Sequence, residues 1–119
     1  MWIRKLESRR EFRAGDDSRL REIIHPAKDG VEIRYSLAHA AVEPGQKTRP
    51  HSLASAEVYY LLQGNGVMHI DGEEAKVGPG ETVYIPPRSV QFIENTGREV
   101  LRFLCIVDPA WRHEDEKVF

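Results

Sequence analysis

The sequence predicts an all-β fold, a small barrel or jelly roll of two antiparallel sheets, from three observations. Short strand-like runs recur about every ten residues between positions 31 and 108. Gly, Pro and Asn punctuate these runs, and Asp71-Gly72 is a dipeptide typical of hairpin turns. No long stretch carries the apolar period of a helix. This combination is typical of a sandwich or barrel.

Seven runs in the central part of the chain have the composition and alternation of strands. They cover residues 31–42, 56–63, 67–70, 73–77, 81–87, 89–95 and 99–108. Alternate residues of a strand face the same side. If Glu57 faces the interior, Tyr59 does so too, and Tyr60 faces outward.

The two ends of the chain differ in composition from this central part. Residues 1–30 are rich in charge, and we expect an N-terminal arm that packs on the barrel or on a dimer partner. Within it, 16–24 is expected to form one or two helical turns that end at His25-Pro26. Residues 109–119 form a charged tail that is expected on the surface. The sequence therefore predicts one domain, with the barrel at 31–108.

Composition excludes several classes of function. The chain has 119 residues and a net charge of −2, so it lacks the basic surface that nucleic acid requires. Its one cysteine, Cys105, lies in an apolar run and is interpreted as a buried hydrophobic residue. The first residues lack a signal-peptide core, and no apolar stretch could span a membrane. We therefore expect a soluble cytoplasmic protein with no nucleic-acid or membrane partner.

Two segments carry polar residues at a specific spacing. The first reads Gly45-x5-His51-x-Leu53-x3-Glu57-x6-Gly64, and the second reads Gly80-x5-Pro86-x-Arg88-x2-Gln91-x3-Asn95. These spacings resemble the two motifs of the cupin superfamily, and the chain is similar to its small single-domain members. The resemblance extends over about residues 31 to 107 and implies a cupin barrel.

The resemblance also implies a divalent metal ion in the barrel interior, with His51, Glu57 and Gln91 as its ligands. Leu53 and Gln91 stand where cupins usually have histidines, and Arg88 replaces a glycine. Tyr59 is the candidate fourth ligand or proton donor. Imidazole and carboxylate ligands suit Zn, Mn, Fe, Ni or Cu. The chain would then bind a metal, or be a metalloenzyme acting on a small molecule; the type of reaction stays open.

A second hypothesis needs no metal. His51 and Glu57 would hydrogen-bond each other in a polar cavity, because buried polar groups need partners. The protein would then be a binding module for a sugar or a small acid.

Other residues are candidates for contacts with a small-molecule ligand. Strand alternation turns Tyr59, Met68 and Ile93 toward the interior, where they would line a largely apolar pocket. Arg34 is a candidate anchor for a carboxylate or phosphate. The alternative for Arg34 is an ordinary surface arginine.

The outer faces of the predicted strands carry apolar side chains. They include Tyr60, Leu62 and Tyr84. An antiparallel sheet usually presents polar residues to water, so these side chains need cover. We therefore expect a homodimer that packs sheet to sheet.

Overall fold

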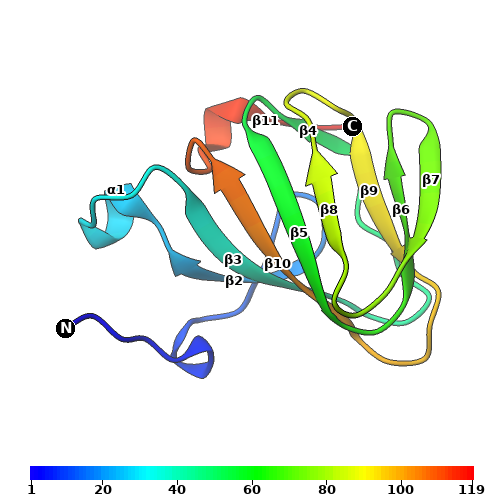
Figure 1. The fold of residues 1–119 in the computed structure, drawn as a ribbon, viewed down its shortest axis with the longest axis horizontal. Helices are drawn as coiled ribbons and strands as arrows, with labels where there is room; N and C mark the ends of the chain where they lie inside the picture. Colours follow the sequence, from blue (N-terminus) through cyan, green and yellow to red (C-terminus); the bar gives the residue numbers. More distant parts are fainter.

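The computed structural model describes all residues 1–119 and is formed by two antiparallel sheets facing each other (Figure 1). The larger sheet has six strands in the order β1-β2-β3-β10-β5-β8, and the smaller has five in the order β11-β4-β9-β6-β7. The predicted all-β class and the two-sheet arrangement are confirmed.

The element bounds follow the chain. The strands are β1 (Phe12–Arg13), β2 (Arg19–Ile24), β3 (Ser36–Val42), β4 (His51–Leu53), β5 (Ala56–Gln63), β6 (Gly66–Ile70), β7 (Glu73–Val77), β8 (Thr82–Ile85), β9 (Gln91–Asn95), β10 (Leu101–Asp108) and β11 (Glu116–Val118). The helical elements are η1 (Leu6–Ser8), α1 (Pro26–Asp29) and η2 (His113–Asp115).

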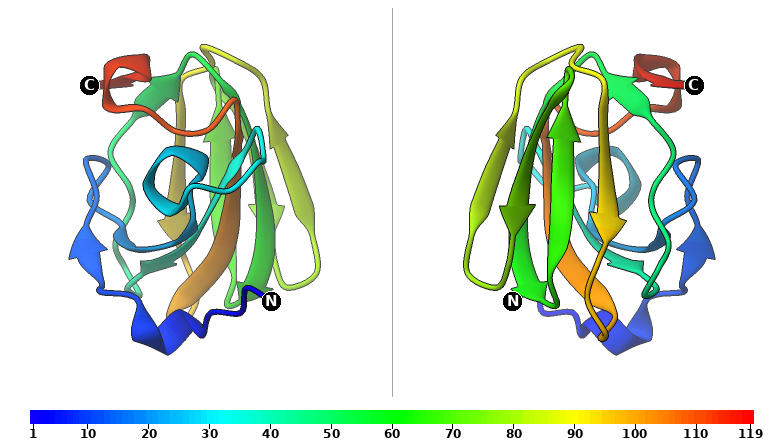
Figure 2. Two further views of the ribbon diagram at one scale, coloured as in Figure 1. Left: turned by 90° about the vertical axis from the view of Figure 1, so that its left-hand side faces the viewer. Right: turned by 90° about the vertical axis from the view of Figure 1, so that its right-hand side faces the viewer.

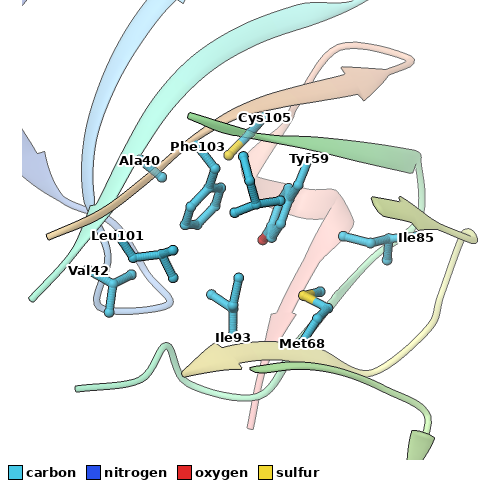
Figure 3. Packing of buried hydrophobic residues seen from close by; sticks show 10 residues of the cluster. Ala40, Val42, Tyr59, Met68, Ile85, Ile93, Leu101, Phe103 and Cys105 are labelled. Atoms are coloured by element: carbon cyan, nitrogen blue, oxygen red, sulfur yellow. The ribbon is translucent and has the colours of Figure 1, made fainter. Parts of the chain in front are cut away.

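The core lies between the two sheets (Figure 3). Tyr59, Phe103 and Cys105 enter it from the six-stranded sheet, and Met68 and Ile93 enter from the five-stranded one. The rings of Tyr59 and Phe103 are in contact, with centroids 4.5 Å apart. Burying such side chains is the main stabilising contribution to a domain of this size.

The N-terminal segment differs from the helical turns expected at 16–24. Residues Arg19–Ile24 form β2, which pairs antiparallel with β3 and extends the six-stranded sheet. Backbone pairing to the edge of β3 outweighs the weak local helical preference, as tertiary contacts often do. His25-Pro26 also acts differently from expectation, because Pro26 opens the short helix α1 and His25 caps it.

The C-terminal segment returns to the barrel. It forms β11, a strand that was not predicted, in which Glu116, Lys117 and Val118 pair with β4. Figure 2 shows the blue N-terminal segment and the red C-terminal segment on the same side of the sandwich. They are close enough that a Cβ added to Gly15 would lie 2.9 Å from a carboxylate oxygen of Glu116. The two terminal segments therefore close one end of the space between the sheets.

Candidate functional site

A cavity of about 530 Å³ lies at this end of the space between the sheets, beside the two terminal segments. Its inner wall includes His51, Glu57 and Tyr59, and its outer wall comes from the N-terminal and C-terminal segments. His51, Glu57 and Tyr59 are all buried. A volume of this size is within the range of pockets that hold small organic molecules.

The strands bring three polar side chains together between the sheets. The Tyr59 hydroxyl donates a hydrogen bond of 2.9 Å to Oε1 of Gln91. The Nε2 of Gln91 in turn donates one of 2.7 Å to Oε1 of Glu57. Tyr59 and Glu57 lie on β5 of the larger sheet, and Gln91 lies on β9 of the smaller one. Gln91 therefore connects the two sheets through both polar atoms of its amide.

Glu57 is held in its neutral form by its surroundings. Burial raises its pKa to about 8, and the nearby carboxylates of Asp16 and Glu116 add to the increase, although the hydrogen bond from Gln91 opposes it. Burial, with a contribution from Glu57, also raises the pKa of Tyr59 well above its usual value. A carboxylic acid with a pKa near neutrality is suited to general acid–base chemistry.

The second oxygen of Glu57, Oε2, has no hydrogen-bond partner in the chain. This oxygen is not completely enclosed by protein atoms. Because Glu57 lines the cavity, Oε2 is available to a molecule bound there.

His51 presents one ring nitrogen to the same space. Its Nδ1 lies 2.8 Å from the carbonyl oxygen of Arg49. A carbonyl only accepts, so Nδ1 carries a hydrogen and donates it to Arg49. The Nε2 of His51 lies 3.7 Å from Oδ2 of Asp16. Both His51 and Asp16 line the cavity.

Asp16 and Glu116 were absent from the residues expected at the site. They come from the two terminal segments, where no motif marks them. The only local signal is Asp16-x-Ser18, which is typical of an Asx turn. In the structure Oδ1 of Asp16 accepts hydrogen bonds from the backbone nitrogen and hydroxyl of Ser18, at 3.0 and 2.7 Å. This turn fixes the carboxylate next to His51.

The other expected ligand residues lie outside the cavity wall. Met68 and Ile93 are packed in the core and do not line the cavity. Arg34 is not among the residues that line it. Its side chain is 84% exposed, and its guanidinium approaches Asp108 at 3.8 Å. Arg34 instead borders a separate surface depression with Arg112. In this arrangement it corresponds to the surface alternative.

The expected metal ligands do not fit a metal ion as a set. The described side chains contain no group of three or more His, Cys, Asp or Glu that could hold one. Both polar atoms of the Gln91 amide are engaged, and its N–H group is directed at Glu57. Leu53, buried and apolar, occupies the position of a usual cupin ligand. A transition metal normally binds several donors at once, and this set offers one imidazole, one carboxyl group and an amide that is already engaged.

Comparisons with known proteins identify relatives with and without a described activity. The chain is 43% identical over 104 residues to an uncharacterized protein of Methanocaldococcus jannaschii, covering 87% of this chain and 82% of that protein. It is 30% identical over 109 residues to the glucose-6-phosphate isomerase of Thermococcus kodakarensis, covering 87% of this chain. It spans only about half, 53%, of that isomerase. It is also 31% identical over 83 residues to an oxalate-binding protein of Thermotoga maritima, covering 68% of this chain and 69% of that protein.

Solved structures support the fold. A cupin 2 conserved barrel domain protein from Salinispora arenicola superimposes with a TM-score of 0.79 and 20% identity, over 96% of this chain and 91% of that one. No helix of the protein has the length and apolarity needed to cross a bilayer. A family model for the cupin domain matches residues 38–107, more than half of the chain. The resemblance in the two motifs is therefore confirmed, and the chain belongs to the cupin-domain family.

Proposed function

We propose that the protein binds a small organic molecule in the cavity between its sheets, without requiring a metal ion. The observation that carries this proposal is that two buried residues lining the cavity each keep a polar atom without a hydrogen bond in the chain, Oε2 of Glu57 and Nε2 of His51. Buried polar groups cost free energy unless they are hydrogen-bonded, so a polar molecule that satisfies both would be favoured. The relatives named for binding oxalate and for isomerising a sugar phosphate support a ligand of similar size.

The hydrogen-bonded chain through Gln91 determines which oxygen of Glu57 can bind the ligand. Because Gln91 holds Oε1, the proton of the neutral acid is left for Oε2, which can donate to an acceptor on the ligand. Tyr59 supports this arrangement because its hydroxyl donates a hydrogen bond that fixes the Gln91 amide. Glu57 is thus the central binding group of the proposal, and Tyr59 is a positioning residue.

Filling the cavity should weaken binding strongly. Ala38 lines it from β3, so Ala38→Phe would occupy the ligand's space. We expect molecules found in a broad NMR fragment screen of the wild-type protein to bind this variant at least about tenfold more weakly. The control is Ala75→Phe on the exposed strand β7. Equal loss in both variants, or no loss in Ala38→Phe, would place the ligand elsewhere.

The pH dependence of stability tests the neutral state of Glu57. Its folded-state pKa of about 8 exceeds the 4.5 of an ordinary glutamate. Its favourable contribution is therefore fully present below pH 4.5 and is lost as the pH rises through about 8. This interval corresponds to roughly 4 to 5 kcal/mol.

The Glu57→Gln variant keeps an acceptor for Gln91 but cannot titrate. We expect the wild type to lose up to about 4 kcal/mol of unfolding free energy relative to this variant between pH 5 and pH 9. Urea denaturation across this range measures the difference. A difference that does not change with pH would contradict a neutral, buried Glu57.

A divalent cation is the second candidate ligand, favoured by one observation. The hydrogen bond from Nδ1 to a backbone carbonyl leaves Nε2 of His51 free to coordinate a metal ion, and histidines that bind metals are commonly oriented in this way. Oδ2 of Asp16 lies 3.7 Å from this Nε2, and both residues line the same cavity. Zn, Mn, Fe, Ni and Cu are the ions to test.

Elemental analysis of protein purified without chelator or affinity tag distinguishes the two candidates. We expect far less than one metal ion per chain, and no increase in Tm when these five ions are added. One ion per chain that is lost in His51→Ala would favour the cation instead.

We also propose that the protein is a homodimer. The outer face of the six-stranded sheet carries Tyr60, Leu62 and Tyr84, which are 40, 43 and 60% exposed. The half-buried Leu104 and Ile106 on β10 continue this apolar face. Contiguous exposed apolar surface of this kind is typical of an interface.

A cytoplasmic location stays a prediction of the sequence.

Charge on this face should separate the subunits. We expect the wild type to have the mass of a dimer in light scattering at micromolar concentration, and the Leu62→Glu/Tyr84→Glu variant to have the mass of a monomer, because burying charge without a partner is costly. The control is Glu73→Lys/Glu74→Lys, exposed on β7 of the other sheet. A monomeric wild type would contradict the dimer.

A further inference from the structure

The outer face of the six-stranded sheet is divided into a basic half and an aromatic half. On β2, Leu20 and Glu22 line the cavity, so Arg21 between them faces outward. On β5, the core residue Tyr59 precedes Tyr60, which therefore faces outward as well. Strands β3 and β10 lie between these two strands, so the basic and the aromatic residues stand on opposite sides of the centre of the sheet.

The strand register places Arg21 and Tyr60 in one row across the sheet. Arg21 is the pairing partner of His39, and His39 is also paired with Leu104. Leu104 pairs in turn with Tyr60. Neighbouring strands are about 4.8 Å apart, so the backbones at the two ends of this row are separated by about 14 Å. Arg21 and Tyr60 of one chain are therefore not neighbours.

The basic half carries more positive charge than its own carboxylates balance. Arg19 forms ion pairs with both Glu11 and Glu43. Arg21 approaches Glu11 only at 4.0 Å, and its Nε is enclosed by protein atoms without a hydrogen bond. None of these ion pairs includes Arg102 of β10, which lies on the same face. Three arginines thus share two carboxylates, and Arg21 can accommodate a further partner.

The aromatic half offers the kind of partner that Arg21 lacks. Tyr60 and Tyr84 are exposed on β5 and β8. A guanidinium group stacks favourably on the face of an aromatic ring, and tyrosine is one of the residues that provide it. The two halves are therefore complementary, although the strand spacing keeps them apart within one chain. A second copy of the chain can bring them together.

Symmetry determines which halves meet when two such faces pack together. A closed dimer uses the same patch of both copies, related by a two-fold axis. With the axis parallel to the strands, between β3 and β10, β2 of one copy lies over β5 of the other. With the axis across the strands, β2 lies over β2, and the arginines of the two copies face each other. Like charges in an interface are costly, so the first arrangement is favoured.

We propose that two copies of the chain pack with the two-fold axis parallel to the strands, so that Arg21 of each copy stacks on the ring of the partner's Tyr60. An axis in this direction keeps every row at its own level along the strands, which is why the two ends of the same row meet. His39 then lies opposite the partner's Leu104 near the axis. This arrangement rests on the proposed dimer and adds to it the orientation of the subunits and the contact that fixes it.

A double-mutant cycle on dimer dissociation tests the contact. Arg21→Ala and Tyr60→Ala should each raise the dissociation constant, because each removes both symmetry-related contacts. We expect the constant of the double variant to be about tenfold lower than the two single effects would give if they multiplied independently. Residues about 14 Å apart in one chain normally act independently, so this coupling reports a contact between copies. Sedimentation equilibrium measures the four constants.

The matched control cycle combines Tyr60→Ala with Lys76→Ala. Lys76 is an exposed cation on β7 of the other sheet, outside the proposed interface. We expect no coupling between these two substitutions.

Chemical cross-linking tests the orientation independently. The native Cys105 is buried, and the wild type serves as the control for its reactivity. Arg21→Cys and Tyr60→Cys are prepared separately, mixed, and treated with a short bismaleimide that can span the roughly 10 Å between packed sheets. We expect cross-linked dimers in the mixture and few in either variant alone, because only the mixture places the two cysteines opposite each other.

The outcomes separate the orientation from the dimer itself. Efficient cross-linking of Arg21→Cys alone would indicate an axis across the strands and would overturn the proposed orientation. Independent effects of Arg21→Ala and Tyr60→Ala in a protein that is dimeric would also overturn it. A wild type that is monomeric in light scattering contradicts the proposed dimer, and the orientation then fails with it.

Discussion

The site depends on one hydrogen-bonded bridge between the two sheets. Gln91 accepts from Tyr59 and donates to Glu57, so a single amide fixes two side chains of the opposite sheet. All three residues are buried, and inside a protein such bonds are strong because water does not compete for them. Removing one of these three side chains would leave a neighbour buried without its hydrogen bond, which explains why the three form a unit.

This bridge accounts for the chemistry of the cavity. Gln91 stands where the second cupin motif usually has a histidine, and an amide adds no charge that could stabilise a carboxylate. Burial is therefore the largest influence on the pKa of Glu57, which rises to about 8. The carboxylates of Asp16 and Glu116 raise this pKa further. The same substitution that removes a metal ligand thus also creates a neutral acid that can donate a hydrogen bond.

Much of the fold could be predicted because strand alternation and turn residues are local signals. The interior positions of Glu57, Tyr59 and Gln91 followed from the alternation along two strands and from the spacing of the motifs. Strand β2 was missed because its pairing with β3 is a long-range contact that its local sequence does not encode. Strand β11 was missed for the same reason, since it is held by pairing with β4.

The chemistry of the site was less predictable from the sequence. Asp16 and Glu116 belong to terminal segments that carry no motif, and only the folded chain brings them next to His51 and Glu57. Arg34 could not be assigned from strand alternation because it precedes β3 and does not belong to a strand, and its side chain is exposed. A side chain's distance from a cavity depends on the packing of whole sheets, which spacing within one strand does not define.

The most direct measurement is the titration of the Glu57 side-chain carboxyl carbon, followed by ¹³C NMR in the ligand-free protein. The account predicts a midpoint near pH 8, with the Tyr59 hydroxyl still protonated throughout the titration. A midpoint close to 4.5, the value of an ordinary glutamate, would contradict it, because Glu57 would then be a charged group that the bridge through Gln91 does not keep neutral.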